Sequence, residues 1–437
     1  MPKNRHKMPR KVAIPVALAG VAALGWTSIG LPGWADEGAK QSPGGTQVSS
    51  AAAPPVACDQ KDSGGKGWYQ PVYVHKAGRD NSAKAIPKIQ HIMWSSDQVF
   101  EASAQRFGNG DSRRLRFVQD EACRIKVMSV AVDGLSGRPS FRDTRKKAQD
   151  AVAAAIAKSD RATRERFKRT RPVYFYDNGA RGCGVGAGPG AQARANLHKG
   201  WAAVSWGCGT VAAVTHELIH NFGVNHCNNN HSQGGDPICR GYDRTPRCND
   251  LMANVVLDCA KDEFRYFDPR PAKGSYLATH WKENVANSPY LIKDQPAKPV
   301  DIRLVARNTG KCLDSGAQST VGQDSCEGGE AQTWRRAIGP TGYLSFTFNG
   351  KCLTAPSGTG SPKLAVCKKG DLRQEWWTPS GRNFSADRYR LVNRASKKAL
   401  SVRAFDKNAP GKDKGSGPAR SGPAASEFRM ELPKSSG

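Results

Sequence analysis

The sequence lacks the patterns that mark zinc fingers and nucleic-acid-binding modules. None of its 12 cysteines stand in a CxxC pair, which disfavours a structural zinc site built from thiolates. The lysines and arginines give a formal charge of +28, but they are spread along the chain without a basic and aromatic nucleic-acid motif. Apart from residues 12–31, no segment is apolar enough to cross a bilayer. We therefore expect no specific nucleic-acid partner.

The N-terminal residues 1–35 have the three parts of a secretory signal peptide. A basic start is followed by the apolar run 12–31 and a small-residue ending, and cleavage is expected after Ala35. The alternative is a signal anchor that stays in the membrane, because the apolar run is rather long. Residues that weaken a membrane-spanning helix favour cleavage: Gly20, Gly25, Gly30 and Pro32. We expect a secreted, extracellular protein with no stable membrane span after cleavage.

The cysteine content agrees with export, because disulfides form in oxidising compartments. Eight cysteines lie between residues 58 and 259 and four near the C-terminus, and these even numbers predict disulfides within each part. Cys58 is expected in a disulfide, while the pairing among the eight stays open. Residues 36–57 are small, polar and proline-bearing, which predicts a flexible linker. The positive charge would draw the exported protein toward anionic polymers.

Histidine is scarce, yet three of the nine histidines lie in the stretch THELIHNFGVNHC, residues 215–227. A single histidine on a helix is usually an ordinary surface residue, and two at a spacing of four arise by chance. The longer pattern fixes five positions, and a random match in such a chain has odds on the order of one in fifty thousand. These positions are His216, Glu217, His220, Gly223 and His226. We interpret the stretch as a metal site.

Apolar residues around the first histidine recur at spacings of three and four, which predicts a helix with one buried stripe. They are Val211, Val214, Leu218 and Phe222. His216 and His220 are one turn apart and therefore project from the same face of this helix. A catalytic zinc ion takes three protein ligands and keeps an open position for water, so a third ligand is required.

The residues after the helix can supply that ligand. Gly223 can adopt a positive φ and end the helix, which turns the chain so that His226 faces the metal. Glu217 follows the first ligand directly and points at the water rather than at the metal. A carboxylate there can act as general base toward a water whose pKa is lowered by zinc. The stretch predicts a hydrolytic Zn²⁺ site with Glu217 as its base.

The run HELIHNFGVNH resembles the signature of the metzincin zinc proteases, and its inner HNFG is similar to that of the adamalysin branch. The resemblance implies a methionine turn below the metal, for which Met252 in NDLMANV is the candidate. Cys227 stands where adamalysins have aspartate, and Asn254 stands where astacins and serralysins place a tyrosine ligand. The similarity therefore extends to the clan and implies no fifth protein ligand. Calcium is a second candidate ion beside Zn²⁺.

The clan resemblance implies an α/β catalytic domain over residues 58–290, with a twisted sheet and a zinc helix. Hydrophobic patterns predict strands at 68–76, 115–120, 125–133, 171–177 and 201–206, and helices at 89–107 and 145–159. In the metzincin fold WAAVSW, residues 201–206, would be the edge strand that pairs with an extended peptide substrate. The glycine-rich segment 179–190 lacks a phosphate-loop ending and is expected to be a flexible loop near the cleft.

A second domain is indicated after the linker LIKDQPAKPV, residues 291–300. RNTGKCLDSG is echoed by FNGKCLTAPSG, AQTWRR by RQEWWTP, and a third copy begins at YRLVNRASKKALSVR. This repeat resembles the ricin-type β-trefoil and covers residues 301–434. The resemblance implies an all-β domain with the bridges Cys312–Cys326 and Cys352–Cys367. It also implies a core formed by Trp334 and Trp376, with Phe428 in the third repeat.

The sugar pocket that this resemblance implies is only partly present. The first repeat keeps Asp314 and Gln332, but Asp324 stands at the position of the aromatic platform. Without an aromatic face a sugar ring has nothing to stack on. Thr354 and Ser401 replace the aspartate in the other repeats. We expect weak or absent galactoside binding, and retention on polysaccharide or other anionic polymers through Lys351, Lys363, Lys368, Lys369, Lys397 and Lys398.

These features predict a secreted zinc endopeptidase that hydrolyses a protein or peptide substrate and is targeted by a lectin-like module. A second hypothesis is a non-catalytic adhesion protein that binds carbohydrate or anionic polymer and keeps a relic protease fold. A third is an anion-binding protein in which charge, not zinc, is decisive. The complete set of three ligands and one base argues against a relic, because such polar residues are costly to keep without a role.

Overall fold

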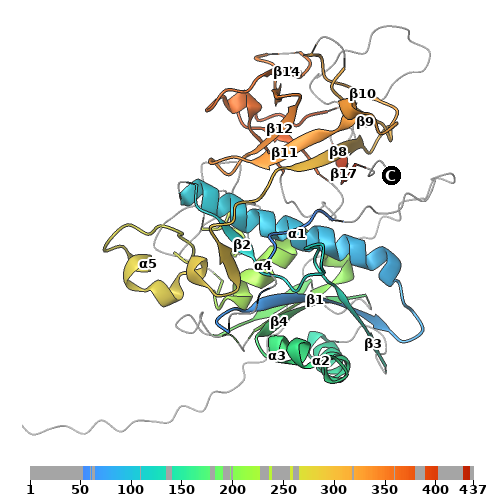
Figure 1. The fold of residues 1–437 in the computed structure, drawn as a ribbon, viewed down its shortest axis with the longest axis vertical. Helices are drawn as coiled ribbons and strands as arrows, with labels where there is room; N and C mark the ends of the chain where they lie inside the picture. Colours follow the sequence, from blue (N-terminus) through green and yellow to red (C-terminus); the bar gives the residue numbers. More distant parts are fainter. Residues whose placement is uncertain are drawn as a thin grey trace, which may run out of the picture. The chain divides into compact units, whose positions relative to one another are not determined.

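The structure is a computed structural model of the 437-residue chain (Figure 1). The residues it describes all belong to Ser49–Gly437, one of two compact units of the chain. They are 53–59, 61, 64–108, 110–133, 140–177, 183–189, 197, 200–226, 236–238, 256–258, 265–316, 319–358, 360–378, 389–401 and 427–433. The expected signal peptide and most of the linker 36–57 lie outside the described residues.

The first part of the described chain is built on a five-stranded mixed sheet with the order β3-β1-β4-β6-β5. Its strands are β1 (Trp68–Lys76), β3 (Met128–Val132), β4 (Thr170–Tyr176), β5 (Gly184–Ala187) and β6 (Trp201–Ser205). Neighbouring strands pair in parallel from β3 through β1 and β4 to β6. In contrast, β5 runs antiparallel to β6 and forms one edge of the sheet.

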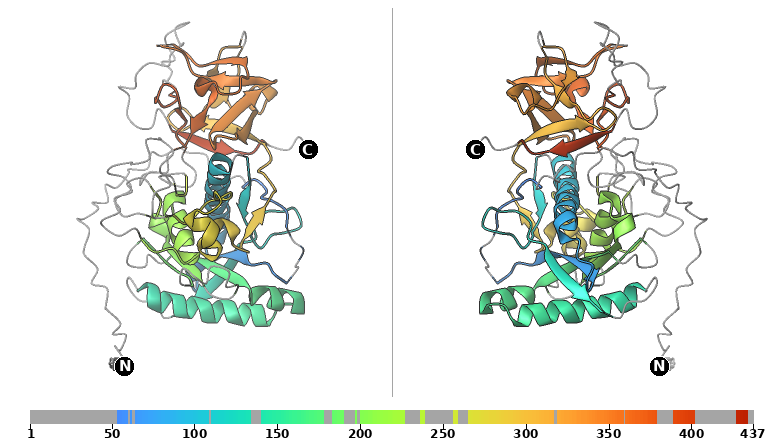
Figure 2. Two further views of the ribbon diagram at one scale, coloured as in Figure 1. Left: turned by 90° about the vertical axis from the view of Figure 1, so that its left-hand side faces the viewer. Right: turned by 90° about the vertical axis from the view of Figure 1, so that its right-hand side faces the viewer.

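Helices cover both faces of this sheet (Figures 1 and 2). They are α1 (Ser82–Phe107), α2 (Phe141–Ala157), α3 (Arg161–Phe167) and α4 (Val211–Asn221). Side chains of β1 alternate between the faces. Tyr73 joins the core formed with α1 and α4, while Val72 and Val74 join the core under α2. This α/β architecture agrees with the strand and helix patterns of the sequence.

Two expectations about the sheet edge are wrong. WAAVSW forms β6, which lies inside the sheet between β4 and β5 and is therefore not the edge strand. The edge is β5, in the glycine-rich segment that we expected to be a loop. Glycines at 184, 186 and 188 give no alternation of apolar side chains, so the usual sequence signal of a strand is missing there.

Three further segments differ from expectation. The pattern 115–120 predicts a strand, but only Leu115 belongs to one, β2 (Arg113–Leu115). That strand pairs with β7 (Leu291–Lys293), which lies within the segment expected as the second linker. Ala53 and Val56, expected in the flexible linker, are buried, and the Val56 amide donates to the Cys123 carbonyl at 3.0 Å. All three segments are short and carry apolar side chains that pack against the core, which accounts for their difference from the expected structure.

Residues 265–293, between the sheet and the second domain, form short elements. These are α5 (Tyr276–Thr279) and the 3₁₀ turns Trp281–Glu283 and Val285–Asn287, which lead into β7. Val285 and Tyr290 are fully buried in the larger core.

The second part is all-β and has three repeats. Its strands are β8 (Val300–Ala306), β9 (Cys312–Asp314), β10 (Gly322–Asp324), β11 (Trp334–Ile338), β12 (Leu344–Phe348), β13 (Lys351–Thr354), β14 (Lys363–Val366), β15 (Trp376–Trp377), β16 (Val392–Asn393) and β17 (Phe428–Glu431). Pairing of β17 with β8 brings the last repeat against the first. The arrangement is that of a β-trefoil.

Each repeat ends in a buried aromatic residue at the start of a strand. Trp334 donates through Nε1 to the Leu313 carbonyl at 2.9 Å, and Trp376 donates in the same way to Leu353 at 3.0 Å. Phe428 opens β17 in the third repeat and is fully buried. All three are core residues, as the trefoil resemblance implied. A phenyl ring fills the third position without the hydrogen bond that an indole would make.

All the described cysteines are paired. The bridges Cys312–Cys326 and Cys352–Cys367 confirm the pairing that the trefoil resemblance implied. In the α/β part, Cys58–Cys123 and Cys183–Cys208 resolve a pairing that the sequence left open. The other four cysteines lie outside the described residues.

Candidate metal centre

The helix α4 presents the candidate site. The side chain of Thr210 caps its N-terminus by accepting a hydrogen bond from the Ala213 amide at 3.1 Å. Val214 and Leu218 are fully buried and fix which face of the helix meets the core. The helix ends at Asn221, and Gly223 follows with φ of 88°, a conformation that costs other residues more. The predicted turn after the helix is confirmed.

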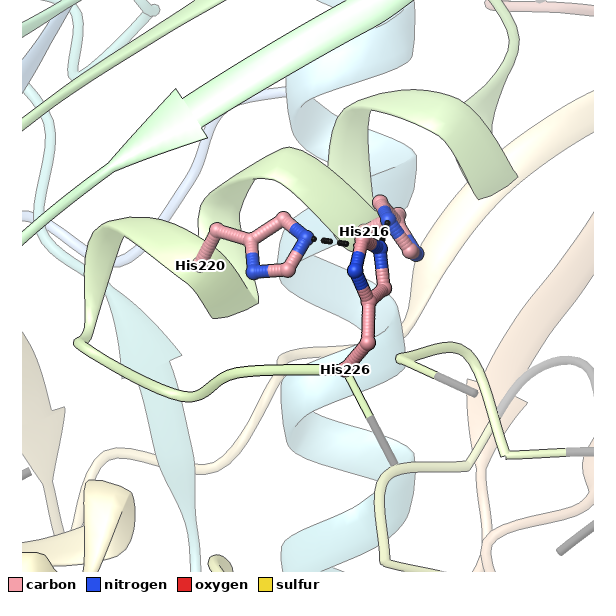
Figure 3. A group of neighbouring side chains, drawn as sticks. All are labelled: His216, His220 and His226. Atoms are coloured by element: carbon pink, nitrogen blue, oxygen red, sulfur yellow. Dashed lines mark hydrogen bonds between the residues drawn. The ribbon is translucent and has the colours of Figure 1, made fainter. Parts of the chain in front are cut away.

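The structure brings the three predicted histidines together (Figure 3). His216 Nε2 lies 3.0 Å from His226 Nε2, and His220 Nε2 lies 3.1 Å from the same atom. The ring of His220 stands at 90° to both of the other rings. One nitrogen of each ring therefore faces a common point, from the helix on one side and from the chain after Gly223 on the other.

The opposite nitrogens of two rings are held by backbone carbonyls. His216 Nδ1 lies 2.6 Å from Pro237 O, and His220 Nδ1 lies 2.8 Å from Val224 O. A carbonyl accepts a hydrogen bond from a protonated Nδ1, which leaves Nε2 as the lone-pair nitrogen. This is how proteins commonly orient histidines that bind metal. The chemistry of these rings therefore suits a cation at the common point.

The spacing of the nitrogens can be compared with that of a zinc site. Zn–N bonds of about 2.05 Å at tetrahedral angles place two nitrogens about 3.3 Å apart. The two short separations of 3.0 and 3.1 Å are within a few tenths of an ångström of this value. Three neutral imidazoles and no cysteine form a donor set that suits Zn²⁺ with one open position. The residues present thus fit this ion.

Glu217 lies beside the first histidine and is almost fully buried. Burial raises the pKa of its carboxyl to about 8. Its Oε2 atom has no hydrogen-bond partner among the described residues. A buried carboxylate without a partner is costly, and such groups concentrate where catalysis needs a proton acceptor. A cation at the histidines would favour the charged form.

Sequence reasoning missed a buried hydrogen-bond network behind His216. The Tyr266 hydroxyl donates to Asp236 Oδ1 at 2.8 Å and accepts a hydrogen bond from the Asp258 amide at 3.0 Å. Asp236 Oδ1 also accepts the Ile238 amide at 2.9 Å. This network fixes the residues on both sides of Pro237, whose carbonyl meets His216. No periodic pattern marks it, because its members come from three separate short segments.

The other predicted site residues are placed differently. Met252 lies outside the described residues. In the trefoil, Asp314 accepts the Gly316 amide at 2.7 Å within a local turn. Gln332 is buried, and its Nε2 donates to the Ser325 carbonyl at 2.7 Å. The Gln374 amide donates to the Val366 carbonyl at 2.9 Å in the second repeat. Each of the two glutamine side chains therefore holds a backbone carbonyl of its own repeat.

The family model of the ricin-type beta-trefoil lectin domain matches residues 300–412. The chain therefore carries a lectin domain of the ricin type in its C-terminal part, in agreement with the strand arrangement described above. No curated protein matches the sequence. Among the described residues, no helix has the length and apolarity that a membrane crossing requires.

Several solved structures resemble part of the chain. The designed three-fold symmetric protein ThreeFoil is 30% identical, and the match covers 30% of this chain and 97% of that one, with a TM-score of 0.24. The BEL beta-trefoil is 20% identical over 32% of this chain and 97% of its own, with a TM-score of 0.26. A Macrolepiota procera ricin B-like lectin, solved with lactose, is 14% identical. The match covers 32% of this chain and 99% of the lectin chain, with a TM-score of 0.26.

Proposed function

We propose that the protein is a secreted zinc-dependent endopeptidase of the metzincin type with a C-terminal lectin module. The observation that carries this proposal is the convergence of three histidine Nε2 atoms beside the buried carboxylate of Glu217. Ligands His216, His220 and His226 would hold the Zn²⁺ ion. The even cysteine sets and the N-terminal sequence support export.

The residues of the site divide the chemistry of peptide hydrolysis between them. Zn²⁺ bound to the three imidazoles would lower the pKa of a water molecule and polarise the scissile carbonyl. Glu217 would take the proton from that water as general base and pass it to the leaving amine. Its burial keeps competing solvent away from the carboxylate and strengthens the proton transfer. The carbonyls at Nδ1 would keep His216 and His220 oriented throughout.

The substrate would lie along β5, not along β6 as the sequence suggested. This strand is the edge of the sheet, and its partner β6 occupies only one of its two hydrogen-bonding sides. An extended peptide can add to such an edge through backbone hydrogen bonds. Gly184 at the start of β5 lies next to Glu217, so a peptide paired there would run past the proposed base.

The trefoil would serve as a targeting module. Its family match supports carbohydrate as a partner. The exposed Asp324 at the platform position argues against a galactoside pocket in the first repeat. Exposed lysines on this domain instead suit an anionic polysaccharide or another anionic polymer. Binding there would hold the enzyme near its substrate.

The test of the proposal begins with the metal. Mature protein should contain about one Zn²⁺ per chain and hydrolyse casein, and a chelator should abolish hydrolysis until Zn²⁺ is restored. Protein that binds zinc tightly but cleaves no protein or peptide would refute the endopeptidase. Protein without affinity for zinc would refute the metal site as well.

A second candidate function is supported by the lectin domain itself. A non-catalytic adhesion protein would need the trefoil but not the histidines. It would bind carbohydrate or anionic polymer equally well after His220→Ala. Adhesion unaffected by this change, together with absent hydrolysis by the parent, would favour the second candidate.

A further inference from the structure

Three glycines in and after the edge strand face the zinc-site helix. They are Gly184 and Gly186 in β5 and Gly188 directly after it, and their spacing of two residues places them on the same side of the sheet. A Cβ atom built on each would come within 2.4 Å of an atom of α4. Real Cβ atoms do not approach neighbours so closely, so the backbone of this strand lies directly against the helix.

The three contacts differ in what they meet. At Gly184 the added carbon would lie 2.4 Å from Glu217 Oε1 and 2.8 Å from its Cγ. At Gly186 it would meet the backbone oxygen of Glu217 at 2.4 Å, and at Gly188 the backbone oxygen of Asn221 at the same distance. At Gly186 the added carbon would also lie 2.7 Å from His220 Cβ, but only at Gly184 are the nearest atoms those of a carboxylate side chain, that of the proposed general base.

The strand cannot move away from the helix without breaking other contacts. The Cys183–Cys208 disulfide ties the residue before β5 to the turn before α4. At the other end, Asn221 Nδ2 donates to the Ala187 carbonyl at 3.2 Å. The four residues of β5 are also paired with β6. An added side chain must therefore be accommodated by Glu217, not by the strand.

A second observation points to the same residue. The Glu217 side chain is more than nine-tenths buried, and its Oε2 has no hydrogen-bond partner among the described residues. Packing, not hydrogen bonding, therefore keeps this carboxylate in place. We infer that Gly184 is a positioning residue for Glu217: the missing side chain creates the space in which the carboxylate can face the histidines. This inference rests on the proposed function.

The first experiment compares Gly184→Ala with Gly207→Ala in full-length protein. Gly207 lies in the turn between β6 and α4, and a Cβ there would meet nothing within 4 Å. We expect Gly184→Ala to lower kcat on a fluorogenic peptide by about 10²-fold or more, because a general base contributes that much. KM should change less than about twofold, since the new methyl group would lie against Glu217 and leave the backbone hydrogen-bonding edge of β5 unaltered. Zinc content should stay close to that of the parent, whereas Gly207→Ala should match the parent in all these properties and in Tm.

The second experiment needs no activity. Replacing Glu217 by alanine removes the carboxylate that the new methyl group would meet. Gly184→Ala should therefore lower Tm in the parent and have no effect on Tm in the Glu217→Ala background. Gly186→Ala should lower Tm in both backgrounds, because the Glu217 backbone oxygen and the His220 Cβ that it would meet are present in both.

These outcomes test the proposed function and the role of Gly184 separately. A parent without hydrolytic activity would refute the proposed function but leave the Tm comparison as the test of the contact. Equal kcat for the parent and Gly184→Ala would overturn the positioning role. A Gly184→Ala effect on Tm that persists without the Glu217 carboxylate would overturn the contact itself.

Discussion

His216 Nδ1 lies 2.6 Å from the carbonyl oxygen of Pro237, 21 residues further along the chain. The first histidine of the candidate site is therefore oriented by a segment outside its own helix. That segment is held by the side chain of Asp236, which accepts hydrogen bonds from Tyr266 and from the Ile238 amide. Zinc affinity should depend on residues that never touch the ion, as it does in other proteins.

Tyr266→Phe tests this dependence. The change removes the hydroxyl that joins Asp236 to the Asp258 amide, so the Pro237 carbonyl loses part of its support. We expect zinc affinity to fall by about 10-fold or more, measured by competition with a chromophoric chelator. Tyr276→Phe is the matched control, because Tyr276 is exposed and its hydroxyl donates to Glu283, outside the network behind His216. Equal affinities for both variants would contradict the role of the network.

The proposed base and ligands should respond differently to substitution. Glu217→Gln is expected to keep zinc and fold but to lose nearly all activity, because an amide cannot accept the proton of the water. The loss should be on the order of 10²- to 10⁴-fold in kcat. His220→Ala should instead lose the metal, since two imidazoles do not complete the site. Peptide hydrolysis and zinc content measured on both variants test this distinction, and a fully active Glu217→Gln would disprove the mechanism.

Much of the site could be predicted because it is local in sequence. The spacing of His216, His220 and His226 around Gly223 determines the ligand geometry through helix periodicity and one turn. The network around Tyr266 could not be predicted, because it joins residues that meet only after folding. The same holds for β5. Its glycines carry no hydrophobic pattern, and their role emerges only from the close approach to Glu217.

Some elements of the fold could likewise be predicted from the sequence, and others could not. β1 has the apolar composition of a buried strand, and its predicted bounds, Trp68–Lys76, are those of the structure. The trefoil could be identified because its repeats preserve tryptophans and cysteines at matching positions. α3 was not predicted, since its seven residues are mostly charged and exposed. Its N-terminal cap, in which Asp160 accepts the Thr163 amide at 2.8 Å, is the sequence signal that was overlooked.

Asp258 should make stability depend on pH. Burial, with a further contribution from Asp236, raises the pKa of its carboxyl to about 8, far above the value of 3.8 expected in the unfolded chain. Between about pH 4 and pH 8 the folded state keeps a proton that the unfolded state has lost. The free energy of unfolding should therefore fall as pH rises through this window, by on the order of 1 kcal/mol per pH unit, and then level off.

Asp258→Asn should remove the part of this slope that Asp258 contributes, while Glu217, whose pKa burial also raises to about 8, keeps its own part. The residue has φ of 52°, which asparagine tolerates, and the amide oxygen can still accept the Tyr266 and Phe267 amides. Urea unfolding at several pH values, in the presence of a chelator, would measure the slope without a contribution from zinc. Asp150→Asn, at an exposed position on α2, should leave it unchanged. An unaltered slope in Asp258→Asn would assign the pH dependence to other groups.

The last prediction concerns what the trefoil binds. Six lysines on this domain are exposed: Lys351, Lys363, Lys368, Lys369, Lys397 and Lys398. Exposed charges attract polyanions over a range set by the Debye length, so their contribution falls as salt is added. We expect the protein to be retained on an anionic polysaccharide column and to elute at moderate salt. Changing all six lysines to glutamine should lower the eluting salt concentration substantially.

The matched control removes the same amount of charge elsewhere. Six basic residues on α2 and α3, between them or at the end of α3 are also exposed: Arg142, Lys146, Lys158, Arg161, Arg164 and Lys168. If only net charge matters, both six-fold variants should elute at the same lowered salt concentration. If the trefoil is the binding surface, the variant that lacks the six trefoil lysines should elute at a much lower salt concentration than the control variant. Tight binding to a neutral sugar that resists salt and is lost in Asp314→Ala would instead show a working sugar pocket, because Asp314 carries no attraction for a polyanion.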